Sequence, residues 1–118
     1  MLDKMITLTP DEMTEYRRYR RQDGRKCEIN GLRWSPANTY EHEERKFRLL
    51  FDLVVNQKEK VITEAIDNKT DKRRDLVSLS TGEIYEVVHS NRDKAVLKKY
   101  ALDGVNAIFT ETEDKKDD

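Results

Sequence analysis

The stretch that decides the fold is RRDLVSLSTGEIYEVVHS, residues 73–90. Two apolar runs rich in β-branched residues flank a Ser-Thr-Gly turn, which predicts a β-hairpin with strands at 75–79 and 83–89. Asp75 opens the first run, and Glu86 lies eleven positions later in the second. Because side chains alternate along antiparallel strands, a bulge-free hairpin with an even-numbered loop points both carboxylates to one face, whereas an odd-numbered loop separates them. We expect the even loop.

Segments on either side of the hairpin show helical and strand patterns in a definite order. A helix is predicted over 39–57 and a strand over 60–66. Beyond the hairpin, a helix is predicted over 92–102 and a last strand over 105–109. The order is therefore helix, three strands, helix, strand.

The helix before the hairpin carries one apolar stripe. Its members repeat at i, i+3, i+4 and i+7 and are Phe47, Leu50, Phe51 and Val54. Extending the stripe backwards by three residues reaches Glu44, so a carboxylate is expected at the start of the buried face, where it needs a partner. The alternative is that Glu44 forms an i, i+4 salt bridge with Arg48.

Residues 1–38 form a polar and basic zone. Thr9-Pro10-Asp11-Glu12 predicts the start of a basic helix that reaches about residue 22, and a short strand is predicted over 26–29. The segment 16–26 holds six basic residues, two tyrosines and a single acid. It is a candidate phosphate-contacting patch, with a solvated helix face as the alternative. The basic residues of this patch are Arg17, Arg18, Arg20, Arg21, Arg25 and Lys26.

Composition limits the class of protein. The 118 residues are 40% charged and 36% hydrophobic, which fits one domain with a modest core and a charged surface. No apolar segment is long enough for a membrane span, and Cys27 is the single cysteine, so we expect a cytoplasmic protein without an internal disulfide. Three zones are expected, namely 1–38, a core at 39–109 and a disordered acidic tail at 110–118.

Two acids on an otherwise apolar face require a counter-charge. A divalent ion supplies it, and carboxylate oxygens suit Mg²⁺ or Mn²⁺. Asp75 and Glu86 are therefore candidate metal ligands. Glu64, expected to face the same way as Ile62 and Ile66, is either a further acid of the site or a charge on an edge strand. Trp34 is expected to cover the core, with stacking on a base as the alternative.

These residues resemble the PD-(D/E)xK nuclease superfamily, which has a restriction-endonuclease-like α-β-β-β-α-β core with a mixed central sheet flanked by helices. The resemblance is closest to small archaeal Holliday-junction-resolvase-like or viral members and spans about residues 40–109. It implies that Asp75 matches the motif Asp and Glu86 its second acid. It also implies that Glu44 matches the acid from the first helix and that the backbone carbonyl of Val87 completes the metal ligands.

The chain departs from the motif at one position that matters. Val88 stands where the superfamily has the Lys that orients water and neutralises the phosphate, and Arg74 stands where it has Pro. Members of the superfamily relocate that Lys, and the candidates here are Lys60 on the neighbouring strand and Lys94 or Lys98 on the following helix. His89 is one residue late and is expected to face the other side.

The resemblance implies a Mg²⁺-dependent endonuclease that cuts DNA and needs no organic cofactor. Glu44, Asp75 and Glu86, with Lys60 or Lys98, would be catalytic, while the basic patch, Lys94 and Lys98 would hold the DNA backbone. A homodimer is a further expectation. The alternatives are a catalytically inactive nucleic-acid-binding module with the same fold and a regulatory protein of a virus or mobile element.

Overall fold

The computed structural model describes residues 6–88 and 94–110, apart from the side chain of Lys94. Helix α1 (Pro10–Arg17) begins with the capping box expected from the sequence, since Thr9 and Glu12 each accept a hydrogen bond from the other's backbone N–H. Helix α2 (Tyr40–Phe51) is capped by Thr39 and continues into a π-helical turn, η2 (Asp52–Asn56). Helix α3 (Lys94–Leu102) follows the hairpin.

A five-stranded mixed sheet lies at the centre of the molecule. Its strands, in spatial as well as sequence order, are β1 (Tyr19–Arg20), β2 (Val61–Asp67), β3 (Arg73–Ser78), β4 (Ile84–Val88) and β5 (Val105–Phe109). The pairs β1–β2, β2–β3 and β3–β4 are antiparallel, and β5 pairs with β4 in parallel. A parallel pair needs a long crossover, and the segment containing α3 provides it.

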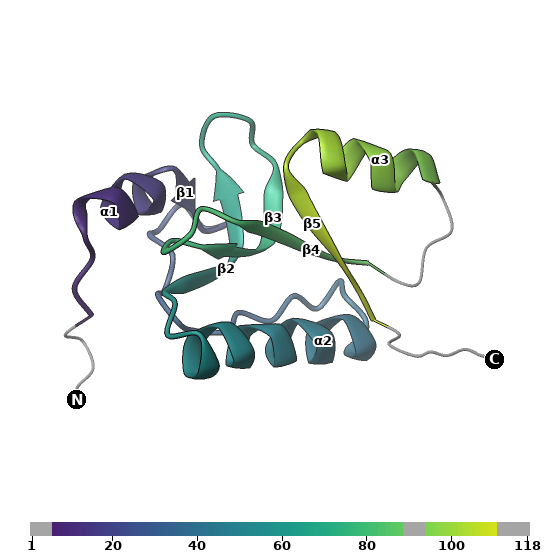
Figure 1. Cartoon of the computed structure of the whole chain (residues 1–118), viewed down its shortest axis with the longest axis horizontal. Helices are drawn as coiled ribbons and strands as arrows, with labels where there is room; N and C mark the ends of the chain where they lie inside the picture. The colour runs from purple at the N-terminus through teal and green to yellow at the C-terminus, as the bar shows by residue number, and fades with distance from the viewer. Residues whose placement is uncertain (1–5, 89–93, 111–118) are drawn as a thin grey trace.

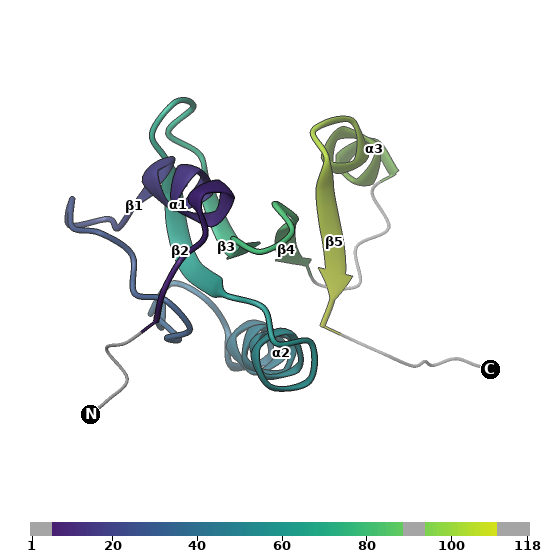
Figure 2. The same ribbon diagram turned by 60° about the vertical axis from the view of Figure 1, so that its left-hand side comes forward.

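Helices cover both faces of this sheet. Figures 1 and 2 show α2 beneath it and α1 and α3 on the opposite side. Two apolar clusters match this arrangement. One joins Leu50 and Leu53 of the α2 segment to the sheet, and the other packs Tyr19 and Cys27 against the opposite face. Among the described residues, no helix is long and apolar enough to cross a membrane.

The α+β class and the order of elements in 39–109 confirm the sequence prediction. The N-terminal zone differs from it. Helix α1 ends at Arg17, five residues early, and Tyr19–Arg20 instead pairs with β2, so this zone belongs to the central sheet. The strand expected over 26–29 is absent from the described structure. The tail at 111–118 and His89 lie outside the described residues.

Only part of the expected apolar stripe of α2 is buried. Leu50 and Val54 pack in the core cluster, but Phe47 is 46% exposed and Phe51 is 50% exposed. The helix also buries His42, Glu43 and Lys46. The prediction was wrong for the two phenylalanines because it scored apolar residues only, whereas the buried charged groups of α2 neutralise one another and can therefore occupy the interior.

Candidate functional site

The β3–β4 hairpin brings the two predicted carboxylates together. Leu76 is paired with Tyr85 and Val77 with Ile84, which confirms the expected even-numbered loop. The pairing ends at Leu76, so the shared face of Asp75 and Glu86 stays a prediction.

Asp75 interrupts the hydrogen-bonding ladder between the two strands. The Val87 backbone N–H donates to Asp75 Oδ2 at 2.7 Å, so a side-chain oxygen is the acceptor for a strand N–H. The same oxygen lies 3.2 Å from Nε2 of His42, which α2 supplies. Asp75 is thus held from β4 and from α2 at once, and it is 8% exposed.

A buried ion network continues from His42 along α2. His42 Nδ1 lies 2.9 Å from Glu43 Oε2, and Glu43 Oε1 lies 2.7 Å from Nζ of Lys46. Lys46 also donates to Glu64 Oε2 at 2.8 Å and to the Arg33 carbonyl at 2.9 Å. Lys46 has no exposed surface, and its three acceptors match its three N–H donors.

Glu64 reaches this network because its backbone departs from strand geometry. Its φ is +49°, a left-handed value that a non-glycine residue rarely adopts within a strand. The usual alternation is broken there. Ile62 and Ala65 pack in the cluster on the α1 side, while Glu64 contacts Lys46 of α2. The expectation that Glu64 shares a face with Ile62 was therefore wrong.

Glu86 is the carboxylate of the pair whose charged form is destabilised. Burial, reinforced by the neighbouring Asp75 carboxylate, raises the pKa of Glu86 to about 8. Its Oε2 is buried without a hydrogen-bond partner, and the nearest described cation, Arg74 Nη1, is 3.9 Å away. Burial, then the charges of Glu86 and Asp75, also raise the pKa of Tyr100 in α3.

In contrast, Glu43 is held in its charged form. Burial opposes ionisation, but hydrogen bonds from Lys46 and Asn38 outweigh it and keep the pKa of Glu43 below its usual value. Glu43 therefore takes the place expected for Glu44, which is exposed on the other side of α2.

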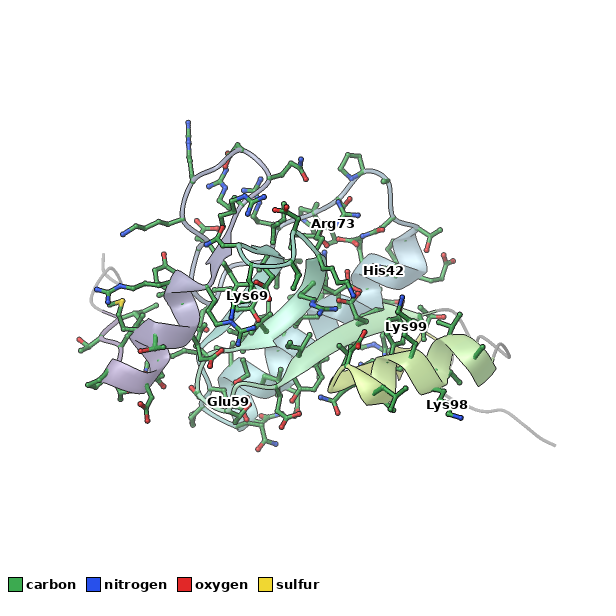
Figure 3. The ribbon with its side chains drawn as sticks, turned by 90° about the horizontal axis from the view of Figure 1, so that it is seen from above. His42, Glu59, Lys69, Arg73, Lys98 and Lys99 are labelled. Carbon is green, nitrogen blue, oxygen red and sulfur yellow. The ribbon has the colours of Figure 1, made fainter. Side chains whose placement is uncertain are left out.

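A cavity of about 340 Å³ opens beside Glu64. Arg33, Trp34 and Arg73 are among the residues that line it, and Trp34 is 64% exposed. The indole therefore does not cover the core. In Figure 3, Arg73 and His42 lie in the same region of the molecule, on the side that the N-terminus of α2 approaches.

Two of the lysines expected to replace the missing motif Lys, Lys60 and Lys98, have other surroundings than the carboxylate pair. Lys60 forms an ion pair with Glu12 at 3.1 Å. It stands four residues before Glu64, which separates the two residues by about 13 Å along the β2 segment. Lys98 is exposed and points away from the sheet (Figure 3). The side chain of Lys94 lies outside the described structure. At Val87, the described contact to Asp75 is made by the N–H, not the carbonyl expected as a ligand.

Acidic partners already engage much of the N-terminal basic patch. Arg18 binds Asp67 at 3.1 Å, Arg20 binds Asp71 at 2.8 Å, and Arg21 binds Asp23 at 2.7 Å. Arg25 is 3.9 Å from Asp23. Within the described chain, Arg17 and Lys26 form no ion pair, so these two retain an uncompensated charge.

Within residues 6–88 and 94–110, no group of three or more His, Cys, Asp or Glu side chains is arranged to hold a metal ion. Comparison with protein-family models, curated proteins and solved structures gave no match.

The sequence reading missed His42, Glu43 and Lys46. A signal was present, since these three polar residues stand at i, i+1 and i+4 and therefore cluster on one side of a helix. The apolar residues at 47 and 51 gave the stronger pattern and set the wrong helical phase.

Proposed function

We propose that this protein is a divalent-metal-dependent nuclease that hydrolyses DNA at the Asp75–Glu86 pair. The observation that carries the proposal is the buried pair of carboxylates, in which Glu86 Oε2 has no hydrogen bond and lies 3.9 Å from the Arg74 guanidinium. The order α2, β2, β3, β4, α3, β5 supports it, because it is the order of the restriction-endonuclease-like core that the sequence resembles.

The pair fits a Mg²⁺ or Mn²⁺ ion. Burial, and then the neighbouring Asp75 carboxylate, disfavour ionisation of Glu86 and raise its pKa, and a bound cation would reverse that penalty. Two carboxylates are sufficient protein ligands for Mg²⁺, which keeps several waters and binds substrate phosphate. When bound there, such an ion would supply a water of lowered pKa and neutralise charge on the phosphate.

The surrounding residues have separate roles in this proposal. His42 is a positioning residue, because Nε2 lies 3.2 Å from Asp75 Oδ2 and Nδ1 lies 2.9 Å from Glu43 Oε2, so its ring holds the Asp75 carboxylate from α2. Lys46 is a positioning residue, because all its donors are engaged and none is left for water or phosphate. Arg33, Trp34 and Arg73 offer two cations and an exposed ring to a nucleic-acid strand.

A second candidate is a module of the same fold that binds nucleic acid without cutting it. Two observations favour it. Val88 leaves the motif position without a cation, and Lys46 cannot replace that cation while it is saturated by Glu43, Glu64 and Arg33.

Cleavage of branched, duplex and single-stranded DNA with Mg²⁺ or Mn²⁺ separates these candidates. The nuclease requires cleavage that depends on the ion and falls at least about a hundredfold in Asp75→Asn and Glu86→Gln, since both remove metal ligands. Salt-sensitive binding without cleavage would select the second candidate. Mn²⁺ titration of the wild-type protein and of Asp75→Asn tests ion binding independently of turnover.

The two adjacent acids of α2 provide a matched control. Glu44→Gln alters an exposed side chain and is expected to leave cleavage unchanged, whereas Glu43→Gln alters the group that orients His42 and is expected to reduce it. The reverse result would restore Glu44 as the ligand from the first helix and contradict the site described here.

A further inference from the structure

A second cavity, of about 420 Å³, lies at the β1 edge of the sheet. It is formed by α1, β1 and the loop after β1, which Figures 1 and 2 show together at that edge. Its volume falls in the range of about 300–1,000 Å³ that is typical of small-molecule sites. None of the predicted catalytic residues is among those that line it.

The cavity combines apolar rings with uncompensated cations. Tyr16 and Tyr19 line it together with Met13, while Arg17 and Lys26 contribute charge that no described acid neutralises. No acidic side chain is among its described lining residues. This combination suits a ligand that has a flat ring and an anionic group.

Local hydrogen bonds hold these groups in place. The Tyr16 hydroxyl donates to the Cys27 carbonyl at 2.7 Å, which fixes the ring against the loop. The loop itself is closed by Arg21 N–H donating to the Arg25 carbonyl at 2.8 Å, with Gly24 at a φ of +85° in the turn. This ordered turn brings Lys26 close to α1, next to the residue that Tyr16 holds.

Tyr19 adds little open surface to the cavity. It is 4% exposed, its hydroxyl is buried without a hydrogen bond, and the Arg18 guanidinium lies 5.5 Å from its ring centroid. Tyr16 is only partly buried, so its ring is the one that a ligand can reach.

We infer that this cavity binds a nucleoside 5′-phosphate, with the base against Tyr16 and the phosphate at Arg17 and Lys26. A guanidinium and an ammonium together suit a phosphate, and a tyrosine ring accepts any base by stacking. The nucleotide is either free or the 5′-phosphorylated end of a strand. Only the second source rests on the proposed function.

Binding is measured by calorimetry in EDTA, with adenosine 5′-monophosphate (AMP), adenosine, inorganic phosphate and phosphotyrosine as probes. AMP is expected to bind at least about tenfold more tightly than any other probe, because it alone supplies both the base and the phosphate. Arg17→Ala and Lys26→Ala are each expected to weaken AMP binding about tenfold. Lys58→Ala, an exposed lysine outside the cavity, is the matched control and should bind like wild type.

Competition with a short single-stranded oligonucleotide separates the two sources. A 5′-phosphorylated strand that displaces AMP, when its 5′-hydroxyl counterpart does not, identifies a strand end; failure of both to compete identifies a free nucleotide. The inference is overturned if AMP does not bind, if phosphate or phosphotyrosine binds as well as AMP, or if the cavity variants behave like Lys58→Ala. Because EDTA removes divalent ions, these results are independent of the proposed cleavage.

Discussion

Replacing Lys46 with Met tests the buried ion network on which the site is built. The ammonium lies 2.7 Å from Glu43 and 2.8 Å from Glu64, and the lysine has no exposed surface. Met fills a similar volume but removes the charge, which leaves two buried carboxylates without this cation. Removing one partner of a buried ion pair costs about 3–5 kcal/mol.

The residual contacts of the two acids place the expected loss at the lower end of that range. Glu43 keeps the Asn38 amide at 2.7 Å, and Glu64 keeps Arg73 at 3.5 Å. We therefore expect Lys46→Met to lose about 3 kcal/mol of unfolding free energy, which corresponds to a fall of about 10 °C in Tm.

The assay is urea unfolding followed by circular dichroism at pH 7, with the slope m compared between variants. Lys46→Met combined with Glu64→Gln should recover part of the loss, because one stranded charge is removed. Arg48→Met, an exposed change on the same helix, should cost less than about 0.5 kcal/mol. A loss below about 1 kcal/mol in Lys46→Met, or no recovery in the double variant, would refute the network as a source of stability.

Three further predictions concern the pair, the first helix and the phase of α2. The pKa of Glu86 is raised to about 8 in the folded protein, so the native state keeps a proton that the unfolded chain releases above about pH 4.5. The free energy of unfolding should therefore fall as pH rises from 5 to 8. In urea titrations at several pH values, Glu86→Gln should remove this pH dependence. Mn²⁺ should oppose the fall in the wild-type protein and have no such effect in Glu86→Gln, if the ion binds there. Glu12 accepts hydrogen bonds from Thr9, Lys60 and Ser80, so Glu12→Ala should cost about 2 kcal/mol by chemical unfolding, whereas the exposed Asp11→Ala should cost less than about 0.5 kcal/mol. Leu50→Ala should lose about 2–4 kcal/mol and Phe47→Ala less than about 1 kcal/mol; equal losses would restore the stripe first expected from the sequence.

The sequence by itself determined the order of elements in 39–109. That order follows from local patterns, namely the apolar periodicity of the helices, apolar runs of strand length and the turn residues between them. Such features act over a few residues, so the printed sequence contains all the information that they need. The odd spacing between Asp75 and Glu86 left an even and an odd hairpin loop open, and the fold has the even one.

Only the tertiary structure decided which groups meet the pair. His42, Glu43 and Lys46 are buried on the side of α2 that faces the sheet, where Lys46 forms an ion pair with Glu64 of β2. Glu64 faces α2 because its positive φ breaks the alternation of the strand. A charged side chain becomes a core residue only when its counter-charge arrives from elsewhere in the fold, and hydrophobic periodicity has no means of expressing that condition. The edge strand at Tyr19 has the same cause, because a two-residue strand exists only through its partner, β2.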